Sequence, residues 1–120
     1  MTQEFIINLV HSRTTGTPGR AENRARDRTL VIDEPIHAGG PGEEITPAEA
    51  FLAGISACGV LLVESYAREA GLPVRSVEAE IQGLRDAREP SWFQRIYLRF
   101  QVAGATQEQA EGLVERYKGR

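Results

Sequence analysis

The sequence contains little cysteine and histidine, and this scarcity excludes several kinds of site. Among its 120 residues there is one cysteine, Cys58, so no disulfide can form within this sequence. The two histidines, His11 and His37, lie on separate segments, and with a single cysteine they lack the ligand spacing that zinc requires. We therefore expect no bound metal. A lone thiol fits a reducing compartment, and we expect a cytoplasmic protein.

Several motifs and long hydrophobic runs are also missing. No Gly-x-Gly-x-x-Gly follows an expected strand, no Walker-type loop is present and there is no Gly-x-Ser-x-Gly elbow, so we expect no cofactor. A Ser-His-Asp arrangement of distant residues stays open. The longest nearly apolar run, 50–63, is shorter than the roughly 20 residues that cross a bilayer. The N-terminus resembles no secretion signal, and we expect no membrane partner.

Positive charge is not in excess, but it is unevenly distributed. The formal net charge is −3 at pH 7, so no overall field attracts the protein to nucleic acid. The segment 12–28 nevertheless contains only two acids and five arginines, namely Arg13, Arg20, Arg24, Arg26 and Arg28. Such a strip is usually a solvated edge; the alternative is an arginine that binds an anion or stabilises a thiolate.

The pattern of hydrophobic residues predicts four strands and two helices. The strands are expected at 4–11, 26–33, 74–84 and 92–102, with a hairpin or flexible loop at 12–23. The helices are expected at 47–70 and after Thr106, which with Gln109 forms a capping box. The order β-β-α-β-β-α predicts a single α+β domain over residues 1–120.

The first predicted helix is apolar nearly all round, which indicates a helix buried on most sides. Thr46 and Glu49 form a capping box at its start, and Gly71 ends it. Gly54 and Gly59 each weaken it by about 1 kcal/mol relative to alanine, so we expect another backbone to approach there. A chain of this length cannot cover such a helix alone, and we therefore expect a homodimer.

Cys58 lies on the apolar stripe of this helix, and two interpretations of it stay open. It is either a small buried hydrophobic residue or a reactive thiol. A reactive thiol must be ionised, and Cys58 is too far from the helix N-terminus to be helped by the helix dipole. A nearby cation would then be needed, and the arginine strip provides candidates.

A spaced combination of residues runs from the end of the second expected strand into this helix. In chain order it comprises Asp33-Glu34-Pro35, Gly39-Gly40, Thr46-Pro47-Ala48-Glu49 and the run 50–58 ending at Cys58. The combination closely resembles the signature of the OsmC/Ohr family, which contains osmotically inducible and organic hydroperoxide resistance proteins, and it is most similar to the OsmC-like branch. The segment 67–74, the later strands and the last helix continue the resemblance over essentially the whole chain.

This resemblance implies a fold, an activity and a set of site residues. The implied fold is OsmC-like, with a long buried central helix wrapped by antiparallel sheet in an intertwined homodimer. The implied activity is that of a thiol-dependent peroxidase, which reduces a small-molecule hydroperoxide at the expense of a thiol reductant. By this resemblance, Cys58 occupies the peroxidatic position. Arg20 is the first choice for the arginine that activates the Cys58 thiolate, and Arg13 and Arg24 are the alternatives. Glu49 is the candidate for the acid that orients this arginine.

The sequence departs from the pattern of the family's peroxidases at two points. These peroxidases usually place the acid directly after the proline, where this sequence has Ala48, with Glu49 one position later. They also carry a resolving cysteine after the last helix, and this sequence stops at Arg120, where that motif should begin. Either the natural chain continues or this member lacks the resolving thiol.

Helix geometry constrains any joint action of Glu49 and Cys58. Nine residues separate them, which corresponds to roughly 13 Å of rise and opposite helix faces. They therefore share a site only if they come from different subunits or if Glu49 lies outside the regular helix. The alternative is that Glu49 only closes the capping box.

Two other functions stay open. The first is a non-catalytic dimeric protein that holds an apolar or acidic small molecule near the arginines, which the absence of a second cysteine favours. The second is a thioesterase of the hot-dog type, since that fold also wraps sheet around a buried helix.

Overall fold

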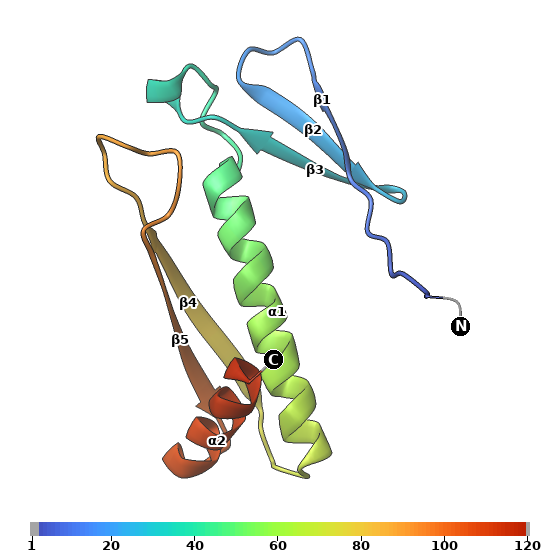
Figure 1. Cartoon of the computed structure of the whole chain (residues 1–120), viewed down its shortest axis with the longest axis vertical. Helices are drawn as coiled ribbons and strands as arrows, with labels where there is room; N and C mark the ends of the chain where they lie inside the picture. Colours follow the sequence, from blue (N-terminus) through green and yellow to red (C-terminus); the bar gives the residue numbers. More distant parts are fainter. Residues whose placement is uncertain (1–2, 120) are drawn as a thin grey trace. The chain divides into compact units, whose positions relative to one another are not determined.

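The computed structural model describes residues 3–119. The chain divides into two compact units, with the boundary between Ala50 and Phe51. The elements follow one another in an order that confirms the predicted α+β class and adds a strand and a short 3-10 helix to it (Figure 1). They are β1 (His11–Thr14), β2 (Arg20–Ala25), β3 (Arg28–Asp33), η1 (Ile36–Ala38), α1 (Pro47–Glu69), β4 (Ser76–Leu84), β5 (Arg95–Ala103) and α2 (Gln107–Lys118).

The first unit contains a three-stranded antiparallel sheet in the order β1-β2-β3. The segment 12–23, expected to be a hairpin or a flexible loop, is a hairpin whose second strand is β2. Sequence patterning did not identify β2 because its residues, Arg20–Ala25, are mostly polar and do not alternate with apolar ones. In the pairing of β2 with β3, Arg20 lies opposite Asp33.

The predicted strand at 4–11 is wrong in its bounds. In the described part of the N-terminus, residues 3–10 are in no regular element, and the strand begins only at His11. Their apolar side chains are open to solvent; Ile6, for example, is 94% exposed. The hydrophobic alternation is present, but the described residues of this chain offer it no neighbouring strand, and a strand forms only where backbone groups are paired.

In the second unit, α1 lies alongside the β4–β5 hairpin, and α2 packs at the end of the hairpin (Figure 1). The buried core consists of Val63, Tyr66 and Ala67 of α1 with Leu113 of α2. Side chains of β4 alternate between half-buried and exposed, as the sequence predicts for a strand with one covered face.

The predicted ends of α1 are confirmed. The Thr46 backbone N–H donates to Glu49 Oε1 over 2.9 Å, and the Glu49 backbone N–H donates to Thr46 Oγ1 over 3.2 Å, which completes the capping box. After Glu69 the chain passes through Gly71 with φ of 66°, a left-handed conformation that glycine adopts without strain. The Leu72 N–H then bonds the Ala67 carbonyl, and the helix ends there.

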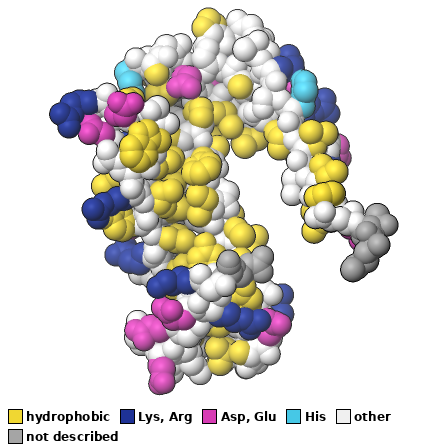
Figure 2. All heavy atoms as spheres, viewed as in Figure 1, with side chains coloured by type: hydrophobic (Ala, Val, Ile, Leu, Met, Phe, Trp, Pro, Cys, Tyr) yellow, Lys and Arg dark blue, Asp and Glu magenta, His cyan; other side chains and the backbone are white. Residues whose placement is uncertain are grey.

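The prediction that α1 is buried on most sides is not met within one chain. Its buried residues are limited to Gly59, Val63, Tyr66 and Ala67, and Leu61 is 62% exposed. Figure 2 shows hydrophobic side chains open at the surface over this unit. Among residues 3–119, α1 is the one helix long and apolar enough to cross a membrane, which is weak evidence because the core helix of a soluble protein passes the same test.

The glycines of α1 behave differently from each other. A Cβ atom at Gly59 would lie 2.9 Å from Cζ of Phe100, so the close approach predicted there exists, but it involves an aromatic side chain and not a backbone. A Cβ atom at Gly54 would meet no atom within 4 Å. The chain itself therefore explains Gly59 and leaves Gly54 unexplained.

Candidate functional site

The candidate arginines Arg13, Arg20 and Arg24 lie on one face of the β1–β2–β3 sheet. Arg20 and Arg24 are four residues apart on β2, and side chains alternate between the two faces of a strand. Arg13 of β1 pairs with Glu22, which lies between them. Three of the five arginines of the strip therefore share one face of the sheet, which we call the basic face, and this face also carries the acids Glu22 and Asp33.

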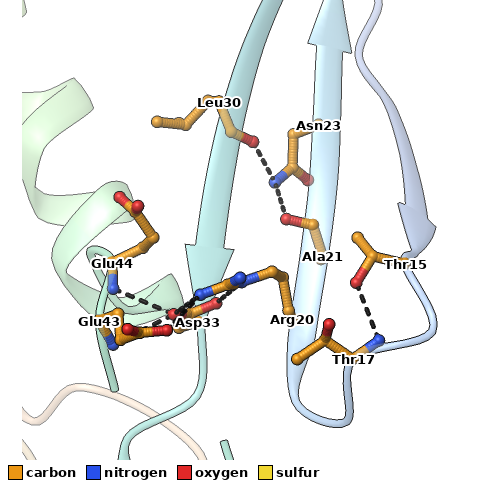
Figure 3. A network of polar contacts seen from close by, with 9 residues as sticks. All are labelled: Thr15, Thr17, Arg20, Ala21, Asn23, Leu30, Asp33, Glu43 and Glu44. Atoms are coloured by element: carbon orange, nitrogen blue, oxygen red, sulfur yellow. Dashed lines mark hydrogen bonds and ion pairs between the residues drawn. The ribbon is translucent and has the colours of Figure 1, made fainter. Parts of the chain in front are cut away.

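Arg20 is engaged by two carboxylates of its own unit (Figure 3). Its Nε donates to Asp33 Oδ1 over 2.7 Å and its Nη2 to Asp33 Oδ2 over 2.9 Å, a bidentate pair. The same Nη2 donates to Glu43 Oε1 over 3.1 Å. The Arg20 side chain is therefore fixed in direction.

Asp33 is the centre of this network and is fully buried. The backbone N–H groups of Glu43 and Glu44 donate to its Oδ2 over 3.1 and 3.0 Å. The hydrogen bonds from Arg20, and then those from the two backbone amides, hold the pKa of Asp33 at about 2, below its ordinary value, and the same pairing raises the pKa of Arg20. The network thus ties the segment before α1 to the end of β3.

Neighbouring charges distinguish the three arginines. The positive charge of Arg20 is balanced by Asp33 and Glu43, and Arg13 lies 3.2 Å from a carboxylate oxygen of Glu22. Arg24 is exposed and makes no ion pair with any residue in the described range 3–119. Arg24 therefore carries the least compensated charge of the three.

Glu49 is engaged at the start of α1. Its Oε1 accepts hydrogen bonds from the backbone N–H and the hydroxyl of Thr46, which lower its pKa. Within residues 3–119, no arginine donates to Glu49. The geometry of the single chain supports the capping interpretation of Glu49 and places the two other carboxylates, Asp33 and Glu43, on Arg20.

Cys58 lies midway along α1 in the second unit, and it is exposed. Its own chain therefore does not bury Cys58, which leaves a small residue covered by a second copy of the chain and a reactive thiol as the two interpretations. The described residues contain no group of His, Cys, Asp and Glu side chains that could hold a metal ion. What the helix offers is an accessible thiol on an apolar surface.

Two features of these units were not predicted. The ion pair of Arg20 and Asp33 depends on the register of β2 and β3, and the hydrophobic pattern does not identify β2 as a strand. The rings of Phe51 and Phe93 stack in parallel with centroids 5.8 Å apart, although 93 was expected to lie in a strand. The opposite charges of Arg20 and Asp33 would indicate that they pair, but only once the register of β2 and β3 is known.

Solved structures of similar fold come from several bacteria. An OsmC-like protein from Mycoplasma pneumoniae has a TM-score of 0.81 at 13% identity, over 96% of this chain and 82% of that one. An OsmC-like protein of unknown function from Vibrio cholerae has a TM-score of 0.82 at 15% identity, over 96% and 89%. An organic hydroperoxide resistance protein OsmC from Legionella pneumophila has a TM-score of 0.70 at 22% identity, over 94% and 82%.

At these identities, the likeness to solved structures shows a shared fold. Comparison with curated protein sequences finds no significant match. The sequence model of the OsmC-like proteins matches residues 40–120, a segment that contains the start of α1, Cys58 and the whole second unit. Because this match spans most of the sequence, the chain belongs to the OsmC-like protein family.

Proposed function

We propose that this protein is a thiol-dependent peroxidase that reduces organic hydroperoxides, with Cys58 as the peroxidatic residue. The observation that carries the proposal is the exposed thiol of Cys58 on the apolar helix α1, in a chain of the OsmC-like family. Similar folds include proteins named for organic hydroperoxide resistance, from Legionella pneumophila and Bacillus subtilis. We propose the cytoplasm as its location, because a reactive thiol needs a reducing compartment.

The reaction begins with the Cys58 thiolate. Its sulfur attacks the oxygen of the hydroperoxide that carries the hydrogen, so an S–O bond forms while the O–O bond breaks. The organic oxygen leaves and takes up a proton, which gives an alcohol. The sulfur loses two electrons and becomes a sulfenic acid, and the hydroperoxide gains them.

A thiol reductant completes the cycle, since this sequence contains no second cysteine. One external thiol condenses with the sulfenic acid, releasing water and forming a mixed disulfide. A second thiol attacks this disulfide, restores the Cys58 thiol and leaves as the oxidised reductant.

The thiolate needs a cation, because Cys58 lies beyond the first turn of α1, where the helix dipole has faded. We propose that the basic face of the β1–β2–β3 sheet supplies it. Arg20 is oriented by Asp33, whereas Arg24 has no recorded carboxylate partner in the described part of the chain. Arg24 is favoured as the residue that stabilises the thiolate because no carboxylate of the described residues compensates its positive charge. Arg20 is favoured because Asp33 holds its side chain in one direction.

We further propose that the active form is a homodimer. The exposed apolar side chains of α1 and of residues 3–10 would be costly to leave in water. A second copy of the chain buries both surfaces and brings a sheet from one subunit to the helix of the other. Light scattering during size-exclusion chromatography should give about twice the 13.2 kDa of one chain.

The test measures consumption of cumene hydroperoxide with dithiothreitol as reductant. The wild type should consume it, and Cys58→Ser should abolish consumption while circular dichroism stays unchanged. Arg24→Gln should slow consumption about tenfold at pH 7 without loss of fold, since a nearby cation favours the ionised thiol. Full activity of Cys58→Ser would exclude the proposed mechanism and favour a non-catalytic binding protein.

A further inference from the structure

The guanidinium of Arg20 uses only part of its hydrogen-bonding capacity within its own unit (Figure 3). Its Nε donates to Asp33 Oδ1, and its Nη2 donates to both Asp33 Oδ2 and Glu43 Oε1. No residue in the range 3–119 accepts a hydrogen bond from the remaining nitrogen, Nη1, which also carries N–H donors. Nη1 is therefore the edge of the guanidinium that is left to bind another group.

Asp33 fixes the direction of this edge because Asp33 is itself fixed. Its side chain has no exposed surface, and its carboxylate also accepts hydrogen bonds from the backbone N–H groups of Glu43 and Glu44. A bidentate contact between a guanidinium and a carboxylate adds a geometric specificity that a single hydrogen bond lacks. The Glu43 side chain is 72% exposed, so its ion pair holds the guanidinium less firmly. The direction of the Arg20 side chain therefore depends on Asp33.

The backbone next to Arg20 is held as closely as the side chain. The Arg20 backbone N–H donates to the Thr17 carbonyl over 3.2 Å, and the Gly19 carbonyl accepts from the Glu34 N–H over 2.8 Å. Gly19 has a φ of 78°, and a Cβ atom there would collide with Cα of Gly40. The loop before β2 is therefore packed backbone to backbone, and Arg20 is fixed at both ends.

The acid that the sequence suggests for orienting the arginine is engaged elsewhere. Glu49 Oε1 accepts hydrogen bonds from the backbone N–H and the hydroxyl of Thr46, and Ala48 has no carboxylate. Stability alone does not explain a buried pair such as Arg20 and Asp33, because apolar side chains of similar volume often stabilise a fold as well as a buried ion pair does. The pair therefore calls for a functional explanation.

We propose that Asp33 is the positioning residue of the peroxidase site and holds Arg20 so that Nη1 donates a hydrogen bond to the Cys58 thiolate. Asp33 thereby takes the role expected for the acid at the start of α1. A directed hydrogen bond from a charged donor stabilises an anion more than a neutral hydrogen bond does, and Arg24 adds positive charge without a fixed direction. This proposal rests on the proposed function of Cys58.

The first test compares the wild type with Asp33→Asn and Glu22→Gln. Asp33→Asn should lower kcat/KM for cumene hydroperoxide about tenfold at pH 7, and it should move the midpoint of the pH profile for alkylation of Cys58 by iodoacetamide upward by about 1 pH unit. Glu22 is a matched control, because it also pairs with an arginine, Arg13, on the basic face. Its variant should change kcat/KM less than twofold and leave the midpoint in place.

The direction of the midpoint shift separates positioning from charge compensation. If Asp33 only compensated the positive charge of Arg20, its removal would leave a stronger cation, and the midpoint for Asp33→Asn would move to lower pH. That result would overturn the proposal. Equal effects of Asp33→Asn and Glu22→Gln would also overturn it, since they would show a general effect of charge on the basic face.

The second test keeps the charge and removes the bidentate contact. Lysine cannot form the two parallel hydrogen bonds of a guanidinium, so Arg20→Lys should lose about as much activity as Asp33→Asn. The double variant should lose no more than either single one, because Asp33 acts through Arg20. Circular dichroism and Tm show whether each variant is folded at the assay temperature, and Arg20→Lys carries the test if Asp33→Asn is not.

The outcomes distinguish this role from the proposed function. Full activity of Arg20→Lys, or losses that multiply in the double variant, would overturn the positioning role and leave the peroxidase function standing. A wild type that consumes no more hydroperoxide than Cys58→Ser would show that the proposed function fails, and the positioning role would fail with it.

Discussion

Arg20 and Asp33 face each other across strands β2 and β3 and form a bidentate ion pair with distances of 2.7 and 2.9 Å. Asp33 has no exposed surface, whereas the Arg20 side chain is one quarter exposed. The buried carboxylate therefore has its charge matched by the arginine and by two backbone amides, and the pair joins the sheet to the segment that leads into α1.

Loss of the Asp33 charge should destabilise the fold more than loss of the neighbouring Glu43 charge. We expect Asp33→Asn to lower Tm by about 5 °C or more, since small losses of stability shift Tm by several degrees in a domain of this size. Glu43→Gln is the matched control, because the Glu43 side chain is 72% exposed and exposed ion pairs contribute little. It should leave Tm within about 2 °C of the wild type, and equal shifts for the two variants would contradict this account.

Acid should remove the contribution of Asp33. Its pKa is about 2 in the folded protein and about 3.9 in an unfolded chain, so the unfolded state binds more protons between these values. The stabilisation is therefore complete above about pH 4 and is lost as the pH falls through about 2. In urea titrations, the stability difference between the wild type and Asp33→Asn should shrink from pH 5 to pH 2; a constant difference would show that the charge does not stabilise the fold.

The role of Glu49 can be resolved by removing its charge and keeping its cap. Glutamine also completes a capping box, so Glu49→Gln should keep the helix start and leave Tm nearly unchanged. Because the structure engages Glu49 with Thr46, we expect hydroperoxide consumption within about twofold of the wild type. A much larger loss of activity at unchanged Tm would indicate that the charge of Glu49 orients an arginine of a partner subunit.

The two central glycines of α1 should respond to alanine in opposite directions. At Gly59 the new methyl group would lie 2.9 Å from Cζ of Phe100, and we expect destabilisation by about 1–3 kcal/mol from overpacking. At Gly54 it meets nothing within 4 Å, and we expect stabilisation by roughly 0.5–1 kcal/mol from better helix propensity. Urea denaturation measures both. Destabilisation by Gly54→Ala would mean that another subunit packs closely there.

The sequence predicted the elements that carry strong periodicity or caps. Both ends of α1 and the alternation of β4 follow from local residues, namely Thr46, Glu49 and Gly71 for the helix and the alternating apolar side chains for the strand. It did not predict β2, because a polar strand held between two others has no hydrophobic pattern. Because β2 was not predicted, the Arg20–Asp33 ion pair was not predicted either, since the register of β2 and β3 places these two residues opposite each other.

Sequence reasoning also placed a strand at 4–11 and expected α1 to be buried in a dimer, and the exposure of both segments in a single chain has one physical origin. A hydrophobic pattern reports which side chains need cover, but it does not say which chain provides it. In this structure Ile6 is 94% and Leu61 is 62% exposed. The patterns are therefore informative about an assembly and not about the isolated chain.

The most direct test of the proposed function is the mass of the protein after a single turnover. The reduced wild type and Cys58→Ser are each mixed with one equivalent of cumene hydroperoxide without reductant, and dimedone is added to trap sulfenic acid. The account predicts the dimedone adduct on Cys58 of the wild type, one equivalent of the product alcohol, and neither in the variant. An unmodified Cys58 with unconsumed hydroperoxide would contradict the account.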